Sequence, residues 1–113
     1  MEKQDWQYLA ERLESVGRGM CLEAARVVRE VLSVDDDRMT DPQLEHAVCG
    51  DVGHFLSTAL DHEDFDVEYL PKVRALETEM IGRTLQYRLH RGWLIRGPGA
   101  PVHFPSVADL IGK

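Results

Sequence analysis

Residues 42–60 read PQLEHAVCGDVGHFLSTAL, and their pattern sets the architecture that we expect for the whole chain. At 100° per residue, five apolar residues of this stretch fall on one side of a helix. These residues are Leu44, Val48, Val52, Phe55 and Ala59. Thr40 or Asp41 can cap such a helix, and Pro42 suits its first turn. We therefore predict a helix over residues 42–60 with one side facing the core.

The opposite side of this helix carries small side chains. His46, Gly50, Gly53 and Ser57 fall within about 60° of one another on the helical wheel, and Cys49 lies beside them. Each glycine in the middle of a helix costs about 1 kcal/mol relative to alanine, so a packing reason is expected. We predict that these five residues form a helix-packing or dimer groove, covered by the C-terminal hairpin described below or by another protein chain. The alternative is that the glycines mark a kink or the end of the helix.

The two histidines and the cysteine of this stretch raise the question of a metal site. His46 and His54 are eight residues apart, which is about 12 Å along a helix, and they point about 80° apart. One zinc ion needs each imidazole nitrogen at about 2.1 Å, so this pair cannot share it. His46 and Cys49 are closer in direction but would need two further ligands. We therefore expect no metal and no cofactor.

Three other segments are predicted to be helices because their apolar residues recur at helical spacing. In the first, the apolar residues are Trp6, Leu9, Ala10, Leu13 and Val16, with Asp5 as the expected N-cap and Gly17 and Gly19 at the end. Residues 20–34 have a wide apolar sector, which is typical of a central helix. Residues 68–92 predict the last helix, with Pro71 near its start.

The chain changes character after residue 91. Residues 93–95 and 102–104 are short apolar runs around a Gly/Pro-rich loop, which predicts a β-hairpin, and Ser106 can cap a short terminal helix over residues 107–111. The fold class that we expect is mainly α. Residues 1–113 would form a single domain, a bundle of about four helices with a small C-terminal β-hairpin and a short terminal helix.

Composition and charge indicate an acidic globular protein. The chain has 113 residues, a hydrophobic fraction of 43% and a formal net charge of −7. Residues 1–68 hold 17 acidic and 6 basic side chains, whereas residues 69–113 hold 3 and 7. No apolar run is long enough to span a membrane, and the start MEKQDWQY has no signal-peptide character, so we expect a cytoplasmic protein. Cys21 and Cys49 are expected to be reduced and buried.

Motifs that identify enzymes are missing from the sequence. It contains no G-x-S-x-G, no G-x-x-x-x-G-K-[ST] and no G-x-G-x-x-G. The acidic run that starts at Asp61 lacks the glycine and the glutamate of a calcium-binding EF-hand loop. We therefore expect that the protein is not an enzyme.

The basic C-terminal part is the expected recognition surface. Arg88, Arg91, Trp93 and Arg96 are predicted to bind acidic groups of a partner. Our leading hypothesis is a small acidic, non-enzymatic protein, expected to be a homodimer, that regulates another protein by direct binding and occlusion. An anti-activator or inhibitor of a transcriptional regulator is one concrete form.

Two other functions compete with this hypothesis. One is a nucleic-acid-binding regulator that uses the basic C-terminal helix and hairpin, although the net negative charge disfavours binding to phosphates. The other is a small enzyme or effector without a recognisable motif. We expect no membrane partner.

Overall fold

The computed structural model describes residues 2–34, 38, 40–90 and 107, and these residues form helices and no strand. The four main helices are α1 (Lys3–Val16), α2 (Gly19–Val34), α3 (Pro42–His62) and α4 (Leu70–His90). The mainly α-helical fold class and the bundle of four helices are thereby confirmed. The predicted β-hairpin lies outside the described residues, as does the terminal helix apart from Val107, which is helical.

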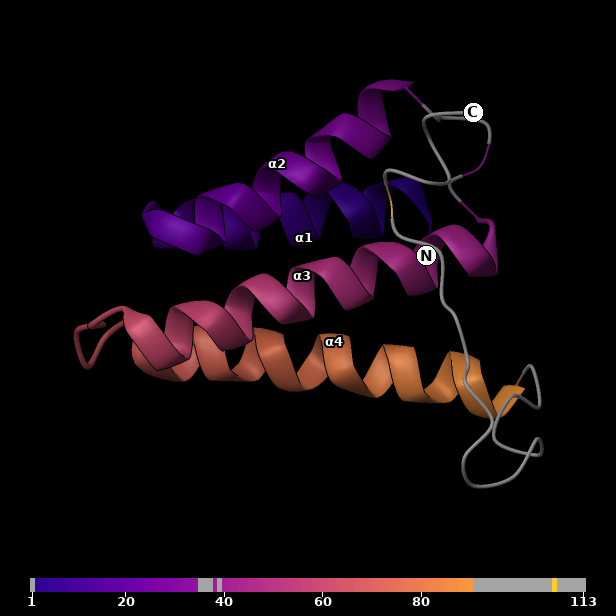
Figure 1. The fold of residues 1–113 in the computed structure, drawn as a ribbon. Helices are drawn as coiled ribbons and strands as arrows, with labels where there is room; N and C mark the ends of the chain where they lie inside the picture. The colour runs from indigo at the N-terminus through magenta and orange to yellow at the C-terminus, as the bar shows by residue number, and fades with distance from the viewer. Residues whose placement is uncertain (1, 35–37, 39, 91–106, 108–113) are drawn as a thin grey trace.

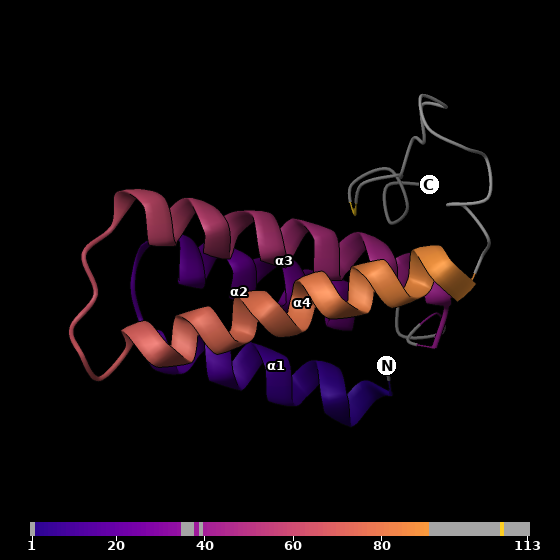
Figure 2. The ribbon, with the colours of Figure 1, turned by 90° about the horizontal axis from the view of Figure 1, so that it is seen from below.

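The bundle consists of two antiparallel helical hairpins, α1 with α2 and α3 with α4 (Figure 1). Each helix packs most extensively against its neighbour in sequence, so α3 is contacted by α2 and by α4. The start of α1 and the end of α4 lie at the same end of the bundle (Figures 1 and 2). Helix α3, which contains Gly50 and Gly53, is therefore enclosed on two sides by helices of its own chain.

The buried side of α1 agrees with the sequence prediction, but its start does not. Trp6, Leu9, Ala10, Leu13 and Val16 are all buried, as their spacing predicted. The helix begins at Lys3 with Glu2 as N-cap, so the prediction of Asp5 as N-cap was wrong. Asp5 is the third helical residue, and its carboxylate accepts a hydrogen bond from the Glu2 N–H at 3.2 Å. An acidic side chain at this position reaches back to the cap and lets the helix begin earlier. Gly17 ends α1 with a left-handed φ of 72°.

Helix α2 supplies the wide apolar sector that its sequence predicted. Its buried residues are Cys21, Ala24, Ala25, Val28 and Val31. Because the alanines are small, neighbouring helices can pack close to α2. The outward positions Arg26 and Glu30 are exposed, as expected of the opposite side.

Helix α3 begins as predicted and buries a wider sector than predicted. The Asp41 carboxylate accepts a hydrogen bond from the Gln43 N–H at 2.9 Å, and Pro42 occupies the first turn. The buried residues include Leu44, Val48, Val52 and Ala59, but Phe55 is only half-buried, and Leu56 is fully buried in its place. The sector is wider because α2 and α4 cover adjoining sides of α3.

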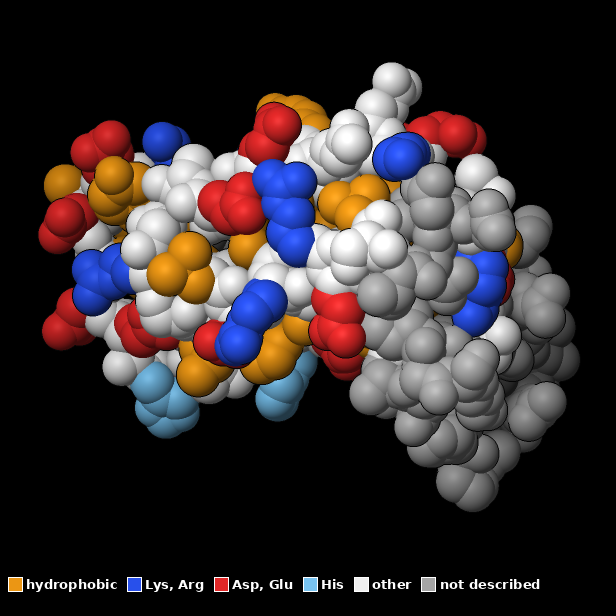
Figure 3. Space-filling view, turned by 90° about the horizontal axis from the view of Figure 1, so that it is seen from above, with side chains coloured by type: hydrophobic (Ala, Val, Ile, Leu, Met, Phe, Trp, Pro, Cys, Tyr) orange, Lys and Arg blue, Asp and Glu red, His pale blue; other side chains and the backbone are white. Residues whose placement is uncertain are grey.

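The outer face of α1 and α2 is a mixed charged surface. In Figure 3, acidic and basic side chains are interspersed over the described part of this face, and apolar side chains appear in small separate areas. Of the helices that the structure describes, none is both long enough and apolar enough to cross a lipid bilayer.

Candidate functional site

A groove of about 390 Å³ lies between α3 and α4. Its lining residues are Cys49, Gly50, Gly53, His54, Ser57, Ile81 and Thr84. We call this feature the α3–α4 groove. It contains four of the five residues that the sequence placed in a small-residue groove. The fifth, His46, is buried one turn earlier on α3, with 3% of its surface exposed.

Helix α4 covers one end of this groove. A Cβ atom built on Gly53 would lie 3.5 Å from the Cβ of Met80 in α4, which is ordinary van der Waals contact. The Ser57 hydroxyl donates a hydrogen bond to the carboxylate of Glu77, also in α4. We expected the C-terminal hairpin or another chain as the cover. At Gly53 and Ser57 the cover is α4, because helical periodicity shows which side is buried without showing which helix buries it.

Gly50 lies at the open end of the groove, and nothing in the described residues requires glycine at this position. Its φ is not positive, and no heavy atom of the described residues, apart from the nearby backbone of α3 itself, lies within 4 Å of the position that a Cβ would take. Gly50 is exposed, and its neighbours on the groove wall include the exposed His54 and Ile81, the latter with 54% of its surface exposed. Alanine in place of Gly50 would favour the helix by about 1 kcal/mol. The glycine therefore lowers the stability of the isolated helix without serving the packing that the structure describes.

Cys49 forms an apolar part of the groove wall. Burial, and then the negative charge of Glu45, raise the pKa of the Cys49 thiol to about 12. The thiol is therefore protonated at neutral pH and is a poor nucleophile. Cys49 and Cys21 are both free and buried.

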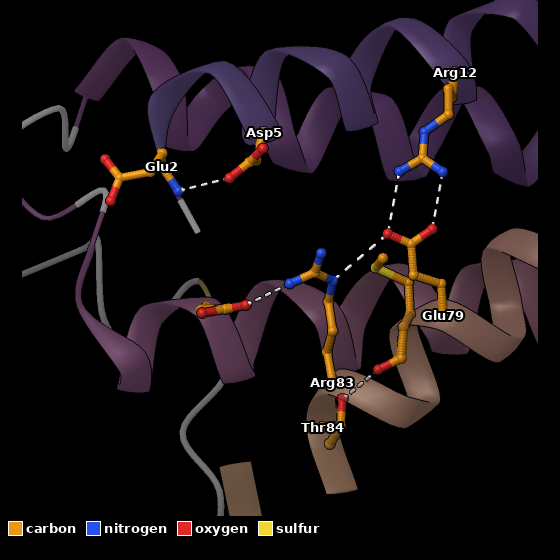
Figure 4. Close-up of polar contacts among 8 residues, drawn as sticks. Glu2, Asp5, Arg12, Glu79, Arg83 and Thr84 are labelled. Atoms are coloured by element: carbon orange, nitrogen blue, oxygen red, sulfur yellow. Dashed lines mark hydrogen bonds and ion pairs between the residues drawn. The ribbon is translucent and has the colours of Figure 1, made fainter. Parts of the chain in front are cut away.

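A chain of charged side chains links three helices on another side of the bundle (Figure 4). Arg12 in α1 donates hydrogen bonds to both carboxylate oxygens of Glu79 in α4, at 2.8 and 3.2 Å. Arg83 in α4 lies 3.6 Å from Glu79 and 3.0 Å from Glu45 in α3. The hydrogen bond from Arg12 holds the pKa of Glu79 below its usual value, and the same bond raises the pKa of Arg12. The guanidinium of Arg83 thus makes its ion pairs within the bundle.

The described residues include only some of those named in the metal-binding and partner-binding predictions. Among the side chains that the structure describes, no group of three from His, Cys, Asp or Glu is placed to hold a metal ion. Arg88 lies in the last turn of α4, but its side chain is outside the described part of the structure. Arg91, Trp93 and Arg96 also lie outside the described residues. Their role in binding a partner stays a prediction.

Comparison with protein-family models, with curated proteins and with solved structures found no match for this chain. The function is therefore argued from the residues themselves. Sequence reasoning missed the α4 half of the groove, Ile81 and Thr84. One signal in the sequence was Ile81 itself, which lies next to the inward-facing Met80 on α4 and therefore points away from the middle of the core face.

Proposed function

We propose that the protein acts by binding another protein, and that a helix of this partner packs into the open end of the α3–α4 groove. The observation that supports the proposal is Gly50. It is an exposed glycine in the middle of a helix, its φ is not positive, and no close neighbour among the described residues requires it. A missing side chain at such a position lets the backbone of a second helix approach closely. The contacts between the two helices would then offset the lost helix stability.

The chemistry of the groove walls suits a helix with small and apolar residues on one side. Ile81 offers an exposed apolar side chain beside the floor formed by Gly50 and Cys49. His54 and Thr84 place polar groups at the same groove. This arrangement of a narrow apolar centre with polar edges is the way in which proteins commonly hold an amphipathic helix.

The proposed mode of action is occlusion, and no chemical step is needed. A partner helix that lies in the groove cannot contact its other binding partners at the same time. A regulator, inhibitor or anti-activator of another protein would work in this way. A second copy of the chain is the competing occupant, and it would make the protein a homodimer through the same groove.

The test compares Gly50→Leu with Gly82→Leu. Gly82 lies on α4, is exposed and does not line the groove. Apart from the nearby backbone of α4, no described heavy atom lies within 4 Å of the position that its Cβ would take. Both substitutions add the same side chain to an exposed helical glycine, so they should affect the fold similarly. We expect proteins captured from the native host by wild type and by Gly82→Leu to be lost with Gly50→Leu, as measured by quantitative mass spectrometry. Equal capture by both variants would contradict the proposal.

Light scattering distinguishes the two occupants. A mass of two chains that falls to one chain in Gly50→Leu, but not in Gly82→Leu, identifies a second copy in the groove. A single-chain mass for all three proteins, together with selective loss of a captured protein, supports the partner helix.

A further inference from the structure

The N-terminus of α2 is capped by a residue from a distant part of the chain. The connection before α2 is Gly17-Arg18, and α2 begins at Gly19, so none of the Ser, Thr, Asp or Asn residues that usually cap a helix is present there. Instead, the backbone N–H of Met20 donates a hydrogen bond to the carboxylate of Glu63 at 3.0 Å. Glu63 lies 43 residues later, directly after the last residue of α3. A carboxylate at this place also interacts favourably with the positive end of the helix dipole.

Gly19 fits this long-range cap for two independent reasons. Its φ of +52° is a left-handed conformation that residues with a side chain rarely adopt. A Cβ built on Gly19 would also lie 2.0 Å from Oε1 of Glu63, much closer than real Cβ atoms approach other atoms. The carboxylate therefore occupies the space that a side chain at residue 19 would take.

The segment around Glu63 is attached to the same turn at a second point. The Glu63 N–H donates to the carbonyl of Ala59 at 2.8 Å, which fixes the backbone at the end of α3. Two residues later, Phe65 is half-buried against the core, and the guanidinium carbon of Arg18 lies 5.5 Å from the centre of its ring. We call residues 63–65 the strap. It joins the turn of the α1–α2 hairpin to the end of α3.

Cys21 lies directly after the capped residue and is fully buried. Burial, and then the charge of Glu63, raise the pKa of its thiol to about 11. Arg18 acts in the opposite direction on this pKa. Because Glu63 and Arg18 both belong to the strap contacts, the environment of Cys21 depends on the strap being closed. The thiol can therefore report on it.

We propose that the strap is a conformational latch: while Glu63 holds the Met20 N–H, the first turn of α2, which contains Cys21, stays packed on the core, and when Glu63 withdraws, this turn opens while the rest of the bundle stays folded. Four N–H groups at the start of any helix lack a partner within the helix, so a helix that begins with glycine and has no local cap depends on such an external acceptor. The latch is separate from the α3–α4 groove, and it holds whether or not a partner binds there.

The test measures how fast Cys21 reacts with a thiol reagent such as dithionitrobenzoate. It uses the full-length protein with Cys49→Ala, so that one thiol remains of the two in the chain. We expect Glu63→Ala to accelerate the reaction by roughly two- to thirtyfold, which is the range that loss of a helix cap implies. Gly19→Ala should have the same effect, because its Cβ displaces the carboxylate. The double variant should react only slightly faster than the faster single variant, since both changes open one latch.

Two controls separate the latch from a general loss of stability. Glu63→Gln keeps an oxygen acceptor for the Met20 N–H but removes the charge that helps to raise the pKa of Cys21, so its rate should rise less than that of Glu63→Ala. Asp41→Ala removes the N-cap of α3, far in sequence from the strap. Compared with the parent at equal free energy of unfolding, it should leave the reaction rate of Cys21 unchanged. The proposal is overturned if Asp41→Ala accelerates the reaction as much as Glu63→Ala. It is also overturned if Glu63→Ala has no effect, or if the effects of Glu63→Ala and Gly19→Ala multiply.

A second readout needs no variant that could fail to fold. This readout is native-state hydrogen exchange of the wild-type protein. The amides of Ala24 and Ala25 donate hydrogen bonds to carbonyls of the first turn of α2. They should exchange through an opening that is easier than global unfolding, unlike the amide of Val48 in the middle of α3. Exchange of all three amides at the same global rate would overturn the latch.

Discussion

Arg12 and Glu79 lie 67 residues apart in sequence, and their side chains form a two-bond ion pair, at 2.8 and 3.2 Å, that joins α1 to α4. The first and the last main helices of the bundle are therefore tied by charge. Arg83 extends the tie to Glu45 and hence to α3 (Figure 4). Each side chain of the Arg12–Glu79 pair is 33% exposed, so solvent screens the pair only in part.

The first prediction concerns the strength of this pair. A double-mutant cycle of Arg12→Ala and Glu79→Ala should give a coupling energy of about 1 kcal/mol, at the upper end of exposed ion pairs because two hydrogen bonds are formed. Urea unfolding measures it. The pair Arg29–Glu14, with side chains 44% and 42% exposed, is the matched comparison and should couple less. Arg12→Lys should lose most of the coupling because lysine lacks the planar fork. Equal coupling for both pairs would contradict this interpretation.

The second prediction is a dependence of stability on pH that arises from Glu79. Its pKa is lowered in the folded protein, chiefly by the hydrogen bond from Arg12, so the unfolded chain binds the proton more tightly. The stabilisation is therefore present above the ordinary carboxyl pKa of about 4.5 and is lost as the pH falls through the lower folded value. Glu79→Gln should flatten the stability profile below about pH 5, where the unfolded chain begins to bind the proton. The free energy of unfolding from urea titrations measures this, and an unchanged slope in the variant would refute it.

The third prediction concerns the glycines of the groove. Gly50→Ala should stabilise the protein by about 0.5–1 kcal/mol, because the added methyl group meets no atom and the helix gains propensity. Gly82→Ala should give a similar gain for the same reason. Gly53→Leu should destabilise the protein by about 1–3 kcal/mol, since its side chain would be forced against Met80 in α4. Thermal unfolding checks all three, and a loss of stability in Gly50→Ala would show that this position is covered in the free protein.

This third prediction also identifies which glycine is suitable for binding experiments. Because Gly53 is in contact with α4 of its own chain, Gly53→Leu changes the fold itself. Substitutions at Gly50 change the open end of the groove and leave the helix intact.

The fourth prediction is that both thiols are unreactive in the native protein at pH 8. Burial raises the pKa of Cys21 to about 11 and that of Cys49 to about 12, so the thiolate fraction is very small at this pH. Labelling with dithionitrobenzoate should be slow under native conditions. In denaturant it should be complete, and two thionitrobenzoate ions should be released per chain because the chain has two cysteines. Rapid labelling of Cys49 in the native protein would show that the groove wall is open to the reagent.

Local features of the fold could be predicted from the sequence because they depend on neighbouring residues. The spacing of Trp6, Leu9 and Leu13 identified the buried side of α1, and Asp41 with Pro42 located the start of α3. In each case the signal lies within a turn or two of helix. The misplaced cap at Asp5 shows the limit of such signals, because an acidic residue serves equally as N-cap or as the third helical residue.

Contacts between distant residues could not be predicted in the same way. Nothing in the sequence near Glu63 indicates that it caps α2, and nothing near Arg12 indicates Glu79 as its partner. The small-residue stripe was located correctly on α3, but its cover at Gly53 came from α4. Periodicity describes one helix at a time, whereas pairing depends on how all the helices pack together.

The order of packing in this bundle has a consequence for how the chain folds. Each helix makes its largest contacts with a helix next to it along the chain, and the α1–α2 connection spans residues 17–18. Closing such short loops costs little entropy, and helical proteins of this kind typically fold in microseconds to milliseconds. Stopped-flow refolding should therefore be nearly complete within the dead time, and the α1–α2 hairpin can form during synthesis before α4 has left the ribosome.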